Sequence, residues 1–135
     1  MKKLLSTKYS AGAFSGAMLV LRLGTGLLMM NHGYDKLLHF GAMQNDFMNF
    51  MGIGKPFSLA LLIFAEFFCS LFIVLGLFTR LATIPLIVAM GVALFMGHNG
   101  EIFGKGELAG LYLACYIVLL LVGPGRVSVD SMVGK

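Results

Sequence analysis

The sequence predicts an all-α protein, a bundle of four transmembrane helices with a short interfacial helix between the first and second spans. Of its 135 residues, 59% are hydrophobic and only 12% are charged, and the mean hydropathy is +0.91. This composition is too apolar for a soluble domain and is typical of an integral membrane protein. Four apolar stretches of about 20 residues, enough to cross ~30 Å of hydrocarbon, alternate with polar segments. We therefore treat residues 1–135 as a single membrane domain.

Signals for helix ends divide the chain into these spans. Pro56 fits the first turn of a helix, where its missing N–H is not needed, and predicts the start of the second span. Thr79 and Arg80 mark the exit of that span from the membrane. The sequence 123–125, Gly-Pro-Gly, predicts the end of the last span, because glycine and proline both stop helices. The predicted spans are 14–36, 57–78, 81–97 and 107–123.

The segment 41–56, between the first two spans, is polar and contains several glycines. Its apolar residues Met43, Phe47, Phe50 and Met51 nevertheless recur at helical spacing. A short helix that lies in the membrane interface explains both features.

Lysine and arginine are distributed unequally over the two sides of the predicted bundle. Four crossings place both termini on one side, which then carries six basic residues against three on the other. The six are Lys2, Lys3, Lys8, Arg80, Arg126 and Lys135, and the three are Lys36, Lys55 and Lys105. The positive-inside rule therefore predicts cytoplasmic termini in a bacterial inner membrane. The lipid bilayer is then the first partner of the chain.

Two charged residues lie deep within the predicted spans, Arg22 in the first and Glu66 in the second. An unpartnered charge at that depth costs at least ~2.5 kcal/mol, and counting residues along antiparallel helices gives both a similar depth. We therefore expect a contact between Arg22 and Glu66. Two interpretations stay open: a salt bridge that only stabilises the fold, and a polar centre that binds a ligand.

Further polar residues extend this centre toward the outer side of the membrane. His32, Gly33 and Lys36 follow Arg22 at helical spacing and form one stripe on the first helix. His98 and Glu107 are expected at the outer ends of the third and fourth spans. The candidate ligand-binding residues are therefore Arg22, His32, Gly33, Lys36, Glu66, His98 and Glu107. No catalytic set stands out among them, so the sequence leaves open whether the protein is an enzyme.

No particular cofactor can be predicted from the sequence. A quinone is compatible with a polar centre inside the membrane. Two histidines on facing helices can hold haem, or a metal ion together with a carboxylate, but no ligand spacing here favours either. Cys69 and Cys115 form no C-x-x-C pair. The net charge of +4 is spread along the chain, so nucleic-acid binding is not predicted.

Several short motifs recur in an order that resembles one family. They are Leu21-Arg22-Leu23-Gly24, His32-Gly33-Tyr34-Asp35-Lys36, Ala65-Glu66, Gly76-Leu77-Phe78-Thr79-Arg80, and Gly123-Pro124-Gly125-Arg126-Val127-Ser128-Val129-Asp130. Together they cover nearly the whole chain and resemble the DoxX family of small bacterial membrane proteins. The resemblance implies a four-helix membrane bundle.

Two functions are expected on this basis. The first is a membrane component of a redox system, either quinone-linked or devoted to thiol stress, with a polar ligand site inside the membrane. The alternative is a non-catalytic assembly factor or interaction subunit for another membrane protein. Either function would require a protein partner or a homo-oligomer.

Overall fold

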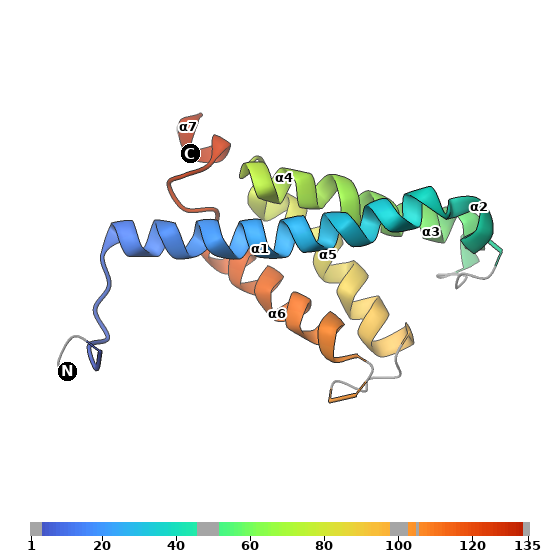
Figure 1. Cartoon of the computed structure of the whole chain (residues 1–135), viewed down its shortest axis with the longest axis horizontal. Coiled ribbons are helices and arrows are strands. Elements are labelled where there is room, and N and C mark those ends of the chain that lie inside the picture. The colour runs from blue at the N-terminus through green and yellow to red at the C-terminus, as the bar shows by residue number, and fades with distance from the viewer. Residues whose placement is uncertain (1–3, 46–51, 98–102, 105, 134–135) are drawn as a thin grey trace.

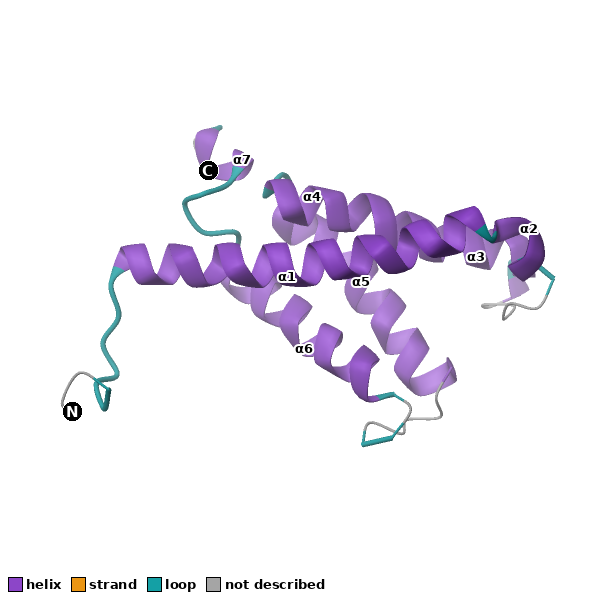
Figure 2. Ribbon diagram, viewed as in Figure 1, coloured by secondary structure: helices purple, strands orange, loops and turns teal. Residues whose placement is uncertain are grey.

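The structure, a computed structural model, describes residues 4–45, 52–97, 103–104 and 106–133. Within these ranges the chain forms helices and no strand (Figures 1 and 2). The all-α prediction is therefore confirmed.

The longest helix, α1 (Ala11–Leu38), contains the first predicted span and continues a few residues beyond it at both ends. Its N-terminus is capped by Ser10, whose Oγ accepts a hydrogen bond from Ala13 N at 3.0 Å. After His39 comes α2 (Phe40–Met43). This four-residue helix overlaps only the start of the segment 41–56, for which an interfacial helix was predicted. Of the apolar residues that predicted it, Phe47, Phe50 and Met51 lie outside the described residues.

The second pass is one continuous helical run that contains a π-helical segment. It consists of α3 (Lys55–Ile63), the π-helix η2 (Phe64–Cys69) and α4 (Ser70–Leu75). Pro56 lies in its first turn, as predicted. The run ends at Gly76, which has a left-handed φ of 72°, a conformation that glycine adopts without strain.

The third and fourth passes are antiparallel and pack against each other. They are α5 (Thr79–Val92), extended by the π-helical η3 (Ala93–Gly97), and α6 (Glu107–Val122). The chain then turns at Gly123 and ends in the short helix α7 (Val129–Met132). Figure 1 shows α7 near the α4–α5 turn, at the same end of the molecule as the start of α1.

Two of these helical runs are long and apolar enough to cross a membrane, Ala11–Leu38 with 28 residues and Lys55–Leu75 with 21. Thr79–Phe95 and Glu107–Val122 are apolar but shorter. Two to four membrane-spanning segments are thus supported. Large apolar side chains also cover the outside of the bundle, as lipid contact requires. Examples are Val20, Leu28, Leu111 and Leu121, each more than half exposed.

Two glycines set the distance between α1 and the second pass. A Cβ atom at Gly33 would lie 2.7 Å from the backbone N of Phe67 and 2.8 Å from the carbonyl carbon of Glu66. At Gly26 a Cβ would meet a methyl group of Val74 at 2.5 Å. The two backbones therefore approach closely at both points, in the way that small residues permit between membrane helices.

Arg22 ties three parts of the chain together. Only 2% of this residue is exposed, and its guanidinium donates four hydrogen bonds to backbone carbonyl groups. Nε donates to Ile73 O and Nη2 to Val74 O, each at 3.0 Å. Nη1 donates to Pro124 O at 3.0 Å and to Val127 O at 2.5 Å. The first helix is thereby connected to the end of α4 and to the segment that follows α6.

The C-terminal segment reaches Arg22 because Asp130 anchors it to the α4–α5 turn. The Asp130 carboxylate accepts hydrogen bonds from Phe78 N at 2.8 Å and Thr79 N at 2.9 Å, which caps the N-terminus of α5. The Asp130 amide in turn donates to Gly76 O at 2.9 Å. The carbonyls of Pro124 and Val127 are held next to the guanidinium as a result.

The predicted contact between Arg22 and Glu66 is wrong. Arg22 lies opposite Ile73 and Val74, whereas Glu66 lies opposite Gly33. The two charges are therefore separated by about 10 Å along the helix axis, at ~1.5 Å per residue. The carbonyls at the end of α4 replace the carboxylate, because the C-terminal end of a helix carries partial negative charge.

Substitution of Gly33 tests the close approach of α1 to the second pass. In Gly33→Ala the new methyl group meets backbone atoms of η2, which cannot rotate away, so we expect a loss of about 1–3 kcal/mol in the free energy of unfolding. The measurement is chemical unfolding in detergent followed by far-UV circular dichroism. Gly24→Ala is the matched control, since nothing lies within 4 Å of a Cβ there. Equal stability of the two variants would contradict the packing described.

Substitution of Arg22 tests the four-carbonyl site. Arg22→Met leaves buried carbonyls without donors, at about 1–3 kcal/mol for each unsatisfied group, so we expect a loss of at least ~3 kcal/mol. Arg22→Lys keeps the charge but has fewer N–H donors, and its stability should fall in between. Unfolding of both is compared with Arg126→Met, an exposed arginine at the same end of the bundle. If Arg22→Met unfolded like that control, the carbonyl contacts would not stabilise the fold.

Candidate functional site

Glu66 forms an ion pair with Lys36. The Nζ atom of Lys36 donates to Oε1 of Glu66 at 2.7 Å, a distance typical of a charge-assisted hydrogen bond. The Glu66 side chain is 5% exposed and that of Lys36 is 21% exposed. The carboxylate is thus enclosed by the bundle, and the ammonium group keeps a path to the outside.

Local backbone structure brings the two side chains together. Gly33 lets α1 lie directly against the backbone at Glu66, and Lys36 stands one helical turn beyond Gly33 on the same face. Glu66 itself lies in the π-helical segment η2. A π-helical turn has one extra residue per hydrogen-bonded ring and is frequent at functional sites, where it redirects a side chain. The sequence did not predict this segment.

Several aromatic rings pack against one another on the helices that carry the ion pair and on α6. The His32 ring lies edge-on to Tyr112, with ring centroids 6.4 Å apart. Tyr112 is stacked on Tyr116 at 6.0 Å. Tyr34 lies against Phe67, the residue that follows Glu66, with ring centroids 6.3 Å apart. The centre therefore offers flat apolar surfaces as well as two charges.

Two buried hydroxyl groups lie deeper in the bundle. Ser70 and Tyr116 are both fully buried, and neither hydroxyl has a hydrogen-bond partner among the described residues. The two groups approach each other without the geometry of a full hydrogen bond. Buried polar atoms are rarely left unsatisfied unless a water molecule or ligand supplies the partner. These two hydroxyl groups are therefore candidates for contact with a water molecule or a ligand.

The candidate residues from the sequence divide into three groups. Gly33, Lys36 and Glu66 form the centre, and His32 borders it. Arg22 binds the four carbonyls at the other end of the bundle and takes no part in this centre. Glu107 is exposed at the first residue of α6 and pairs with no described residue. His98 lies outside the described residues.

Sequence analysis missed Tyr112, Tyr116 and Ser70. The two tyrosines could have been found from the sequence. They are four residues apart, which places both on one face of an otherwise apolar helix. Among the described residues, no three His, Cys, Asp or Glu side chains are grouped closely enough to hold a metal ion. Cys69 and Cys115 are both free thiols. The chemistry of the centre is therefore that of an ion pair, hydroxyl groups and aromatic rings.

Comparison with known proteins identifies the family of the chain. A protein of Haemophilus influenzae, described as an uncharacterized protein, is 30% identical over 118 residues, which cover 82% of this chain and 86% of that protein. No solved structure matches the chain. The family model described as DoxX matches residues 17–99, a range that contains Arg22, Gly33, Lys36 and Glu66. The chain therefore belongs to the DoxX family of membrane proteins.

Proposed function

We propose that this protein binds a quinone-like ligand at the Lys36–Glu66 centre and serves as a membrane component of a redox system, either quinone-linked or thiol-stress-related. The observation that carries the proposal is a mostly buried ion pair beside aromatic rings and two unsatisfied hydroxyl groups. A salt bridge alone would explain the charges but not the unsatisfied hydroxyl groups. Buried pairs are also often no more stable than apolar packing, so stability is a weak reason for keeping one.

The topology that we propose has all four helical passes across a bacterial inner membrane, with both termini in the cytoplasm. Two observations support it. The start of α1 and α7 lie at one end of the molecule (Figure 1). That end also carries Arg80 and Arg126, in keeping with the positive-inside rule. The Lys36–Glu66 centre then lies toward the outer leaflet, within reach of a lipid-soluble ligand.

The ion pair can serve both redox forms of a quinone. The Lys36 ammonium group donates hydrogen bonds and suits the carbonyl oxygen of the oxidised ring. The Glu66 carboxylate accepts hydrogen bonds and suits the hydroxyl group of the reduced ring. Tyr112 and His32 supply aromatic surface for the ring itself. The chain holds no redox-active group of its own in this scheme, and a protein partner supplies the electrons.

Ligand binding is tested by thermal unfolding of the purified protein with and without a soluble ubiquinone analogue. A ligand specific for the folded state should stabilise the protein by about 2.7 kcal/mol at roughly 100 times its Kd, and so raise Tm. We expect Lys36→Met and Glu66→Gln to lose most of that rise. Mass spectrometry of a lipid extract of the same preparation shows which quinone copurifies.

The matched control is Lys55→Met, which removes an exposed lysine that donates to Asn45 O at 3.3 Å. It should keep the full rise in Tm. If no quinone copurified and no analogue raised Tm in the unsubstituted protein, quinone binding would be ruled out. Recovery of one membrane protein by crosslinking in native membranes would then support the assembly-factor alternative.

A further inference from the structure

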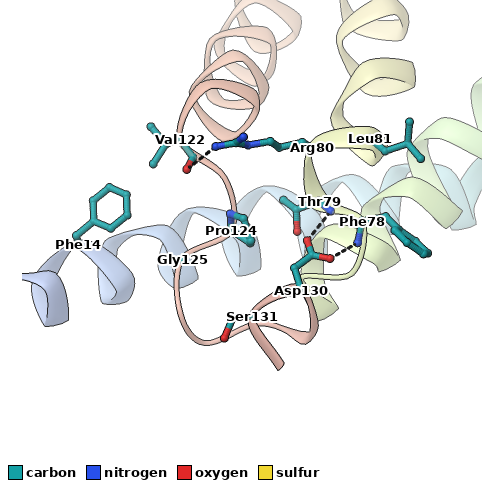
Figure 3. Close-up of a pocket in the computed structure, with 10 residues that line it drawn as sticks. All are labelled: Phe14, Phe78, Thr79, Arg80, Leu81, Val122, Pro124, Gly125, Asp130 and Ser131. Carbon is teal, nitrogen blue, oxygen red and sulfur yellow. Dashed lines mark hydrogen bonds between the residues drawn. The ribbon is translucent and has the colours of Figure 1, made fainter. Parts of the chain in front are cut away.

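A second candidate site lies at the opposite end of the bundle from the Lys36–Glu66 centre. A cavity of about 430 Å³ opens there between the start of α1, the α4–α5 turn, the end of α6 and the segment that leads to α7 (Figure 3). Its wall contains Arg80, Asp130 and several apolar side chains. The function proposed above makes no use of this cavity.

Arg80 brings an available positive charge to the cavity. Its Nη2 donates a hydrogen bond to Val122 O at 3.2 Å (Figure 3). The guanidinium also lies close to Gly123. A Cβ at position 123 would come within 3.2 Å of Nη2, so the glycine makes room for the guanidinium. Among the described residues no carboxylate pairs with Arg80. The side chain is exposed and keeps donors free for an anion.

Asp130 also lines the cavity, but its negative charge is already engaged. Its two carboxylate oxygens accept hydrogen bonds from the amides of Phe78 and Thr79 (Figure 3). The positive charge of the buried Arg22 guanidinium also acts on this carboxylate. Among the described residues that line this cavity, the arginine, and not the aspartate, is therefore the charge that lacks an oppositely charged partner.

The rim of the cavity is apolar and exposed. Phe78 is 59% exposed, Leu81 66% and Val122 39%. Phe78 has a φ of 50°, which a residue with a side chain rarely adopts, and its bond to Asp130 holds it there. Figure 3 shows its ring pointing away from the cavity floor, on the side of Leu81. In addition, the buried Thr79 hydroxyl in the cavity wall has no hydrogen-bond partner among the described residues.

We propose that this cavity binds the phosphate headgroup of an anionic phospholipid. The Arg80 guanidinium matches the geometry of a phosphate, with which arginine forms paired hydrogen bonds. The acyl chains would lie along Phe78, Leu81 and Val122, whose exposure at the edge of the bundle suits lipid. A free phosphate would share the contact with Arg80 but would gain nothing from these apolar side chains. A basic pocket between helices is a known way for membrane proteins to hold anionic lipids.

Native mass spectrometry of the full-length protein in detergent tests this proposal. The protein is incubated with equal amounts of phosphatidylglycerol and phosphatidylcholine, which differ in net charge. We expect phosphatidylglycerol to bind preferentially by about tenfold, the effect of one charge-assisted hydrogen bond. Arg80→Gln should reduce the preference to near unity, and Arg80→Lys should keep part of it. Equal binding of both lipids to the unsubstituted protein would overturn the proposal.

A control variant and a soluble competitor show whether the preference depends on Arg80 and on the acyl chains. Arg126→Gln removes another exposed arginine near the C-terminus that does not line the cavity, and it should keep the full preference. Soluble glycerol 3-phosphate carries the headgroup chemistry without acyl chains and should not displace the bound lipid. Displacement by this compound would show that the cavity takes a free phosphate and would overturn the lipid assignment. An undiminished preference in Arg80→Gln would overturn the role of Arg80.

Discussion

The hydrogen bonds from Arg22 to four backbone carbonyls are the interaction on which the rest of the structure depends. A guanidinium inside an apolar bundle must be satisfied, and here the acceptors come from Ile73, Val74, Pro124 and Val127. These carbonyls belong to the end of the second pass and to the segment after the fourth. One side chain of the first helix therefore connects the end of the second pass, which Gly76 terminates, to the C-terminal segment, which Asp130 anchors.

The bundle contains two separate polar centres, Arg22 with its four carbonyl groups at one end and the Lys36–Glu66 ion pair toward the other. Arg22 donates its hydrogen bonds to backbone carbonyl groups, and Glu66 pairs with Lys36. The Arg22 centre holds three parts of the chain together, which is a structural role. The Lys36–Glu66 centre is bordered by aromatic rings and by hydroxyl groups without partners, which makes it the better candidate for ligand binding. The family comparison supports the membrane setting of both centres and leaves the ligand to experiment.

The helices could be predicted from the sequence because their signals are local. Apolar length, Pro56 at a helix start and glycine with proline after a helix end gave bounds within a few residues of those observed. The contact partners of Arg22 and Glu66 could not be predicted in the same way. Depth counting treats each pass as a straight α-helix and considers only charged partners. Depth counting therefore missed the π-helical segment at Glu66 and the early end of the second pass at Leu75. It also missed the backbone carbonyls that accept hydrogen bonds from Arg22.

The central claim is that the charges of the bundle form two independent centres, and double-mutant cycles test it most directly. Unfolding free energies are measured in detergent for the single and double variants of two pairs, Lys36→Met with Glu66→Leu and Arg22→Met with Glu66→Leu. Residues in direct contact show coupling, whereas distant residues add to within about 0.5 kcal/mol. We predict a coupling of about 1 kcal/mol or more between Lys36 and Glu66, and additivity between Arg22 and Glu66. A coupling between Arg22 and Glu66 as large as that of the Lys36 pair would contradict the account.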